Sequence, residues 1–362
     1  WHFVGLLGWL SALKTRGAML ARMIAKTQDA ICMLSISMAL FLSVMDFAQL
    51  ASAETLKVGV RKDAPPFSYY ASDGAVDTVL MGMPTEHGFD GYMVRVCEYV
   101  LQGLDNNGGI EVETHVVDAG NRFSKLKNGT VHILCDPATI TPERLRGALA
   151  STPIYMSAVT YAAPDPLPPK DPSGTDCANI VGLVGDTTAY RGIWEILNHG
   201  SWPRFGGRIK QELESMESGG RLKSLEARAP SATCSSEAIK FYETHDLLAK
   251  DFCEQSTIYY VGDVGIIRSK IKEYGCLEAI NVAPAIYTDE RYAIYTALPG
   301  ASDDKVPSKL ILRFLAELSR QLHNESESVL VRVFNEINKG KDYKASEKLK
   351  TFLWSITGDY PD

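Results

Sequence analysis

Eight consecutive residues, 137–144, carry the side chains best suited to binding a small charged molecule. Their sequence is Pro-Ala-Thr-Ile-Thr-Pro-Glu-Arg. A threonine, a proline and an acidic residue at 141–143 are typical of a helix start. Arg144 is therefore expected in the first helical turn, where its planar guanidinium and free backbone N–H groups can bind a carboxylate. The carbonyl of Pro137 can accept from an ammonium group, so the segment predicts a site for both charged ends of an amino acid.

The surrounding chain must hold this segment in place, and its apolar pattern alternates between strand-like and helix-like stretches. We expect strands at 57–60, 112–117, 131–134, 159–161, 180–184, 222–227, 258–261 and 292–297. We expect helices at 92–101, 122–127, 189–197, 236–249, 309–321 and 328–338. Strands that alternate with helices in this way predict an α/β fold with largely parallel sheets.

The motif Pro-x-Thr-x-Thr-x-x-Arg, followed by Ser-Thr-Pro at 151–153, resembles the ligand signature of the type II periplasmic amino-acid-binding proteins. These proteins form solute-binding family 3 and share their fold with the ligand cores of ionotropic glutamate receptors. Further similar segments occur in the family's order, at 56–70, 91–92, 121–130, 185–189 and 259–267. The resemblance spans residues 56 to about 300. It implies two α/β lobes, a two-segment hinge and a ligand cleft between them.

The resemblance also implies how the chain divides into lobes. Lobe 1 is expected to contain residues 54–162 and 288–362, and lobe 2 residues 163–287. A proline-rich stretch at 163–172 is typical of the crossover between them. The expected strand at 292–297 returns the chain to lobe 1, where the helical tail would pack. The implied function is capture of a free amino acid for an ABC permease of the inner membrane, without a cofactor.

Both lobes offer candidate ligand-binding residues. Lobe 1 provides Pro137, Thr139 and Arg144. In lobe 2, Thr187 and Thr188 follow a strand and open a helix, so their hydroxyls and nearby backbone donors predict an anion site. An ordinary helix cap is the alternative for these threonines. Asp263 stands where the family places the acid that pairs with the ligand ammonium, although an acid at this point could also serve only as a cap.

Three more lobe 1 residues bear on which amino acid is bound. Phe67 occupies the place of the aromatic wall that covers the ligand in relatives, with a place in the core as the alternative. Arg61 and Arg122 stand where the glutamate- and aspartate-binding branch carries arginines that recognise the side chain. Three guanidiniums exceed what one carboxylate needs, which favours an acidic ligand. Asp63 and Asp136 could instead neutralise one arginine and favour another side chain.

The sequence departs from the family's pattern at several points. Asp136 stands where glycine is usual, and Arg95 replaces an acid that commonly follows the Gly-Tyr helix start. Residues 76–87 form an insertion that we expect at the cleft mouth. Residues 200–220 are longer than is typical. These departures concern the identity of the ligand more than the fold.

Residues 1–53 have the features of an export signal. Arg22 and Lys26 precede an apolar stretch at 31–44, and Ala-Ser-Ala at 51–53 is a small-x-small cleavage site. We expect cleavage after Ala53 and a periplasmic protein with no stable membrane insertion. An uncleaved amino-terminal anchor is the alternative.

Composition narrows the classes of partner. The net charge of −7 argues against nucleic acid and anionic membranes, because both require a basic surface. Six cysteines follow the expected cleavage site: Cys97, Cys135, Cys177, Cys234, Cys253 and Cys276. An even number in an exported chain suggests disulfides, although six cysteines allow 15 pairings and buried thiols are the alternative. If bridges stay within the implied lobes, Cys97 and Cys135 pair with each other.

Enzyme and metal signatures are missing from the sequence. It contains no Gly-x-Ser-x-Gly elbow, no phosphate-binding loop, no dinucleotide fingerprint, no Cys-x-x-Cys and no His-x-x-x-His. We therefore expect a binding protein that is not an enzyme. The alternative is an exported dehydratase or lyase, because cyclohexadienyl dehydratases share the implied fold. Such an enzyme needs a general acid over its substrate, for which Glu143, Asp63 or Asp136 would be candidates.

Overall fold

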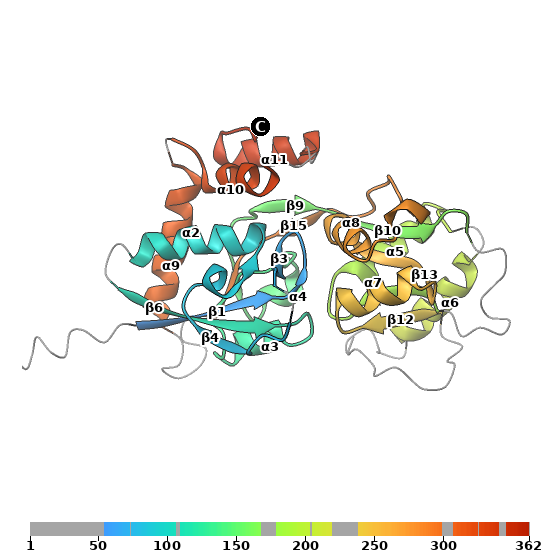
Figure 1. The fold of residues 1–362 in the computed structure, drawn as a ribbon, viewed down its shortest axis with the longest axis horizontal. Coiled ribbons are helices and arrows are strands. Elements are labelled where there is room, and N and C mark those ends of the chain that lie inside the picture. Colours follow the sequence, from blue (N-terminus) through green and yellow to red (C-terminus); the bar gives the residue numbers. More distant parts are fainter. Residues whose placement is uncertain are drawn as a thin grey trace, which may run out of the picture. The chain divides into compact units, whose positions relative to one another are not determined.

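The computed structural model describes residues 54–72, 74–105, 109–167, 179–202, 205–218, 238–298, 307–324, 326–339 and 345–361. These residues belong to a single unit, Glu54–Asp362. The expected signal peptide lies outside the described residues. Two larger β-sheets, each packed against helices, organise the unit (Figure 1). The predicted α/β class with two lobes is therefore confirmed. We call the elements around the six-stranded sheet lobe 1 and those around the five-stranded sheet lobe 2.

The lobe 1 sheet has the strand order β4-β6-β1-β7-β16-β8. Its parallel centre is β1, which pairs with β6 and β7, and antiparallel strands complete both edges. The bounds are β1 Glu54–Arg61, β4 Val79–Met81, β6 Ile110–Val117, β7 Ile133–Leu134, β8 Leu149–Ala150 and β16 Tyr295–Thr296. Because parallel strands end at the same edge of a sheet, Arg61 at the end of β1 and the loop after β7 lie close together.

Helices cover this sheet because each has one apolar face. Helix α2, Tyr92–Asp105, buries Val96, Val100 and Leu101 on that face. The carboxyl-terminal helices are α9 Ser308–Leu322, α10 Val329–Asn338 and α11 Glu347–Thr357. Helices α9 and α10 pack against α2, as predicted for the helical tail, and α11 packs against α10 (Figure 1). Short elements complete the lobe: β2 Asp63–Ala64, β3 Ser68–Tyr70, β5 Phe89–Asp90, η1 Pro84–His87, α3 Arg122–Lys127 and α4 Pro142–Leu145.

The lobe 2 sheet has the strand order β12-β11-β13-β10-β14. Strand β11 pairs in parallel with β12 and β13, and β10 runs antiparallel to β13 and β14. The strands are β10 Val159–Pro164, β11 Asn179–Val184, β12 Ile239–Tyr242, β13 Thr257–Asp263 and β14 Ile280–Val282. The helices are α5 Ala189–Asn198, α6 Gly206–Ser218, α7 His245–Cys253, α8 Val264–Glu273 and the short η4 Leu277–Ala279.

Two neighbouring strands connect the lobes. Strand β9, Tyr155–Ser157, pairs antiparallel with β15, Glu290–Tyr292. One leads into β10 of lobe 2, and the other returns the chain toward β16 of lobe 1. A pair of crossing strands is the usual form of a two-segment hinge, and Glu290 lies directly in it.

Two predicted elements differ in the structure. The predicted helix at 236–249 is wrong, because Ile239–Tyr242 forms β12 beside β11 and the helix begins only at His245. β-branched and aromatic residues favour the strand, and the Thr244 side chain caps the helix by accepting from the Leu247 N–H. The predicted strand at 292–297 divides into β15 and β16, which belong to different sheets. The strand predicted at 222–227 lies outside the described residues.

The insertion at 76–87 lies elsewhere than predicted. Its strand β4 pairs with β6 at the outer edge of the lobe 1 sheet, and its η1 turn packs against α2. No residue of this insertion lines the cavity between the lobes that is described below. The expectation that it borders the cleft mouth is therefore wrong, because the insertion extends the sheet instead.

Two disulfides join described residues. Cys97 on α2 bonds to Cys135 after β7, as expected for bridges within lobes, and Cys253 bonds to Cys276 in lobe 2. Cys177 and Cys234 lie outside the described residues.

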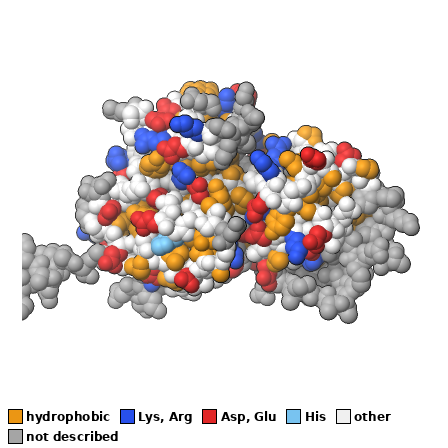
Figure 2. All heavy atoms as spheres, in the orientation of Figure 1, with side chains coloured by type: hydrophobic (Ala, Val, Ile, Leu, Met, Phe, Trp, Pro, Cys, Tyr) orange, Lys and Arg blue, Asp and Glu red, His pale blue; other side chains and the backbone are white. Residues whose placement is uncertain are grey.

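Surface charge is mixed. On the face drawn in Figure 2, acidic, basic and hydrophobic side chains are interspersed. None of the described helices is both long and apolar enough to cross a membrane.

Candidate functional site

Arg144 projects between the lobes from the short helix α4. Its Nη1 donates to the Thr139 carbonyl at 2.8 Å, and its Nη2 donates to the lobe 2 carbonyl of Asp186 at 3.4 Å. The guanidinium also lies over the Phe123 ring, 4.8 Å from the centroid. Burial, together with the charge of Arg122, lowers the pKa of Arg144 to about 10. Among the described residues no carboxylate forms an ion pair with it, so this cation has no bound counter-charge.

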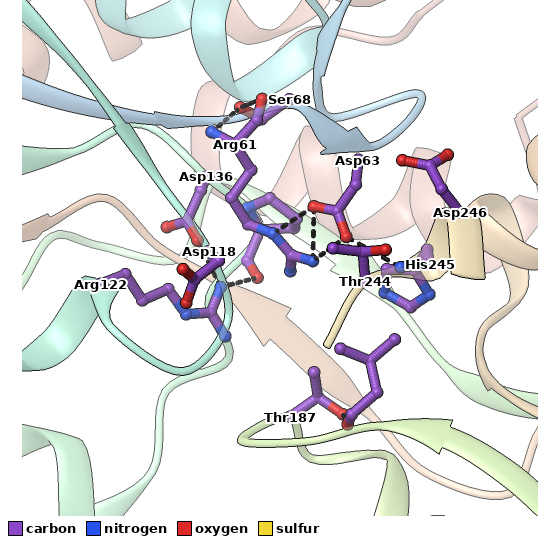
Figure 3. Close-up of polar contacts among 12 residues, drawn as sticks. Arg61, Asp63, Ser68, Asp118, Arg122, Asp136, Thr187, Thr244, His245 and Asp246 are labelled. Carbon is purple, nitrogen blue, oxygen red and sulfur yellow. Dashed lines mark hydrogen bonds and ion pairs between the residues drawn. The ribbon is translucent and has the colours of Figure 1, made fainter. Parts of the chain in front are cut away.

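Arg61 has such a counter-charge. Its Nε and Nη2 donate to the two Asp63 oxygens at 2.9 and 2.8 Å, a bidentate pair that is almost fully buried. Figure 3 shows both side chains meeting beside His245. Burial alone would raise the pKa of Asp63, but the charge of Arg61 and the hydrogen bond from the His245 backbone lower it to about 2. Asp63 therefore stays ionised and bound to Arg61.

The same carboxylate reaches across to lobe 2. The backbone N–H of His245, the first residue of α7, donates to Asp63 at 2.9 Å, so a lobe 1 charge meets the positive end of a lobe 2 helix. The His245 ring is buried and its Nδ1 lies 2.8 Å from the Tyr260 hydroxyl. Burial lowers the pKa of His245 to about 3, which keeps the ring neutral.

Arg122 is paired in a similar way. Its Nη1 forms a short ion pair with Asp136 and also donates to the Pro137 carbonyl at 3.2 Å. Both charged side chains are buried, and Figure 3 shows them side by side. The pairing is one-sided, because Nε of Arg122 and Oδ1 of Asp136 have no hydrogen-bond partner among the described residues. One buried donor and one buried acceptor remain for water or a ligand.

A buried carboxylate, Glu290, joins hydroxyls from both lobes. It accepts from Thr188 at 2.6 Å and from Thr288 at 2.8 Å, and it forms a short hydrogen bond with Thr139. The Thr139 and Thr188 hydroxyls are also only 3.3 Å apart. Thr188 precedes α5 but makes no capping bond with its side chain, so its hydroxyl serves this cluster.

Asp263 ends β13 and caps α8. Its Oδ1 accepts from the backbone N–H groups of Gly265 and Ile266 at 2.7 and 3.1 Å, and its Oδ2 accepts from the Tyr292 hydroxyl at 2.5 Å. Tyr292 belongs to the hinge strand β15, so this contact also joins the lobes. Burial raises the pKa of Asp263, and a nearby cation would restore its charged form.

These groups line one cavity between the lobes. Its volume is about 30 Å³, which is room for one or two water molecules. The lining includes eight of the nine sequence-predicted site residues, namely Arg61, Arg122, Pro137, Thr139, Arg144, Thr187, Thr188 and Asp263. It also includes Glu290, His245 and Tyr292, which the sequence analysis did not single out. The cavity is therefore polar, narrow and charged on the lobe 1 side.

Phe67 lies apart from this lining. Its side chain is 1% exposed and packs edge-on against Tyr155 and Tyr292, with centroids 5.0 and 5.2 Å away. The structure thus places it in the lobe 1 core, the alternative considered above. Thr187 lines the cavity, but its hydroxyl already donates to the Val184 carbonyl at 2.8 Å.

The residues that were missed left little signal in the sequence. Glu290 lies 146 positions after Arg144 in the chain, and nothing in its neighbours distinguishes it from a surface acid. Neutralisation of an arginine by Asp63 was one of the alternatives taken from the sequence, and side chains two residues apart in extended chain do point to one side. The corresponding signal for Arg122 was the unusual aspartate at position 136.

Comparisons with known proteins agree with this fold. The family model described as bacterial extracellular solute-binding proteins, family 3, matches residues 56–230. No curated protein sequence is significantly similar to the chain.

Solved structures show the same fold at low identity. An ancestral arginine-binding protein bound to arginine is 13% identical with a TM-score of 0.52, and the match covers 78% of this chain and 97% of the other. The cysteine-binding protein from Campylobacter jejuni is 16% identical with a TM-score of 0.52, covering 80% and 92%. A substrate-binding protein of an ABC uptake transporter from Streptococcus pneumoniae, with bound histidine, is 14% identical with a TM-score of 0.50, covering 81% and 95%. Residues 56–230 therefore belong to the bacterial extracellular solute-binding proteins of family 3, and the chain has the two-lobed fold of their amino-acid-binding structures.

Proposed function

We propose that the protein is an exported receptor that encloses one free α-amino acid between its lobes and delivers it to an ABC permease. The observation that carries this proposal is Arg144, a guanidinium held at the cavity without a carboxylate partner among the described residues. Arg144 is partly exposed, and desolvation by the surrounding protein lowers its pKa. A ligand carboxylate would supply the missing counter-charge and a bidentate pair.

The opposite charge is available at the same cavity. Asp263 and Glu290 both line it, and an α-ammonium has three donors to share between them. Binding of the ammonium would also favour the ionised form of Asp263, whose pKa is raised by burial. The carboxylate of an amino acid thus matches Arg144, and its ammonium matches the carboxylates of Asp263 and Glu290.

A dehydratase has weaker support. Glu143 is exposed, and hydrogen bonds from its own backbone N–H and Thr141, with the charge of Arg191, lower its pKa to about 2. Asp63 is also held ionised, so neither can donate a proton near neutral pH. Asp263 is the cavity carboxyl with a raised pKa, and it is the group that a turnover assay would need to probe.

The test combines binding with a search for chemical change. Purified protein is titrated calorimetrically with the common amino acids, and also with prephenate and arogenate, and the recovered ligand is analysed by mass spectrometry. We expect one amino acid per protein, recovered unchanged. Solution scattering should show compaction on binding, because a ligand that touches both lobes favours the closed state. Turnover of a cyclohexadienyl substrate, or no amino-acid binding at all, would contradict the proposal.

A further inference from the structure

The two extra arginines at the cavity are already neutralised inside lobe 1. Arg61 pairs with Asp63 through two hydrogen bonds, and Arg122 pairs with Asp136. All four side chains are at most 3% exposed. A buried pair that is fully desolvated does not release one partner without leaving an uncompensated charge.

What remains at the cavity matches an amino-acid backbone alone. Arg144 can take the α-carboxylate, and Asp263 with Glu290 can take the α-ammonium. For the ligand side chain the paired arginines leave single donors such as Nε of Arg122, which is buried and unpartnered among the described residues. A single N–H donor suits a neutral oxygen or a water molecule. The Arg122–Asp136 pair to which this donor belongs carries no net charge.

We propose that Asp63 and Asp136 set the specificity of this site, so that it accepts amino acids with uncharged side chains and rejects acidic ones. A ligand carboxylate near Arg61 or Arg122 would face the aspartate already bound there, and like charges in a buried site repel. A basic side chain would meet the two arginines.

This inference rests on the proposed function, and the first experiment separates the two. Wild-type protein is titrated with the pairs glutamate and glutamine, aspartate and asparagine, and with serine, alanine, arginine and lysine. We expect an uncharged amino acid to bind best, at least tenfold more tightly than either acidic one. Tightest binding of an acidic or a basic amino acid would overturn the specificity and leave the receptor function standing. Absence of any amino-acid binding would contradict both the specificity and the receptor function.

The second experiment releases Arg122. In Asp136→Asn the side-chain shape is kept and the counter-charge is lost, so the ratio of acidic to amide ligand affinity should rise at least tenfold. Asp90→Asn is the matched control, because Asp90 pairs with Arg95 in lobe 1 and neither residue lines the cavity. The control should keep the wild-type ratio. An unchanged ratio in Asp136→Asn would refute the role of Asp136.

A double variant covers the case in which Asp136→Asn does not fold. Arg122→Gln with Asp136→Asn removes both charges and leaves none unpaired. Because the pair carries no net charge, removing both of its members should leave the ratio of acidic to amide ligand affinity within about tenfold of the wild-type ratio. A rise in that ratio without the Arg122 charge would overturn the proposal.

Discussion

The two walls of the cavity are built from different chemistry. Lobe 1 contributes three arginines, each anchored by carbonyls or carboxylates of its own lobe. Lobe 2 contributes threonine hydroxyls, the amino ends of α5, α7 and α8, and Asp263, which carries the negative charge of its wall. Leaving hydroxyls and helix ends in contact with water costs little free energy, whereas charges that are already held in position bind a ligand strongly. We infer that lobe 1 captures the ligand and lobe 2 closes over it.

The largest expected effect is on the lobe 1 side. Arg144→Ala should weaken amino-acid binding by about 3 kcal/mol or more, roughly a hundredfold, because it leaves an enclosed carboxylate without a partner. Arg144→Lys keeps the charge but loses the bidentate geometry of the guanidinium. The affinity of this variant should therefore lie between those of the wild type and Arg144→Ala. Calorimetric titration measures both. Undiminished binding by Arg144→Ala would contradict the inference that lobe 1 captures the ligand.

A smaller effect concerns His245, a buried neutral group in the lobe 2 wall. His245 has a folded pKa of about 3, below its ordinary 6.5. As pH falls below 6.5, the unfolded chain therefore binds a proton that the folded protein excludes, and stability is lost progressively toward pH 3. Between pH 6.5 and 5 this contributes a loss of about 2 kcal/mol.

Urea unfolding at several pH values measures that loss. His245→Gln cannot be protonated, so its free energy of unfolding should fall less over the same interval. Identical slopes for the wild type and this variant would show that His245 is protonated in the folded state, and that burial does not keep its ring neutral.

The smallest effect is expected at the rim, where both walls are exposed. Arg191 of α5 donates to Glu143 of α4 at 2.9 Å, with the side chains 42% and 55% exposed. Water and salt screen such pairs, so Glu143→Gln should change ligand affinity by less than about 1 kcal/mol, roughly fivefold. A loss as large as that of Arg144→Ala would mean that the rim, not the cavity, controls closure.

Sequence patterns predicted some parts of the molecule well because those parts are local. Helix α3 and the segment from Pro137 to Arg144 follow from caps, periodicity and residue type within a few positions. The division between β15 and β16 depends on which sheet each residue pairs with, and the strand β12 depends on its neighbour β11. Such partners are distant in the chain.

The same distinction applies to the site. The contiguous motif placed Arg144, Thr139 and Pro137 at one cavity, whereas Glu290 reaches it only through the hinge strand. The charge state of Arg61 could not be read from its position alone, because pairing with Asp63 depends on side-chain direction and burial. The position of Phe67 was open for the same reason, because an apolar ring suits either a protein core or the wall of a ligand site.

The disulfide between Cys97 and Cys135 has a consequence for how the protein must be produced. Cys135 directly precedes Asp136 and Pro137, so the bond ties the loop that holds Arg122 to the long helix α2. A disulfide formed in an oxidising compartment therefore holds the loop at Asp136 and Pro137 in place as well as stabilising the fold. Protein made in a reducing cytosol would have this loop free of its covalent anchor, and we expect its ligand preference to be less sharply defined than that of the oxidised protein.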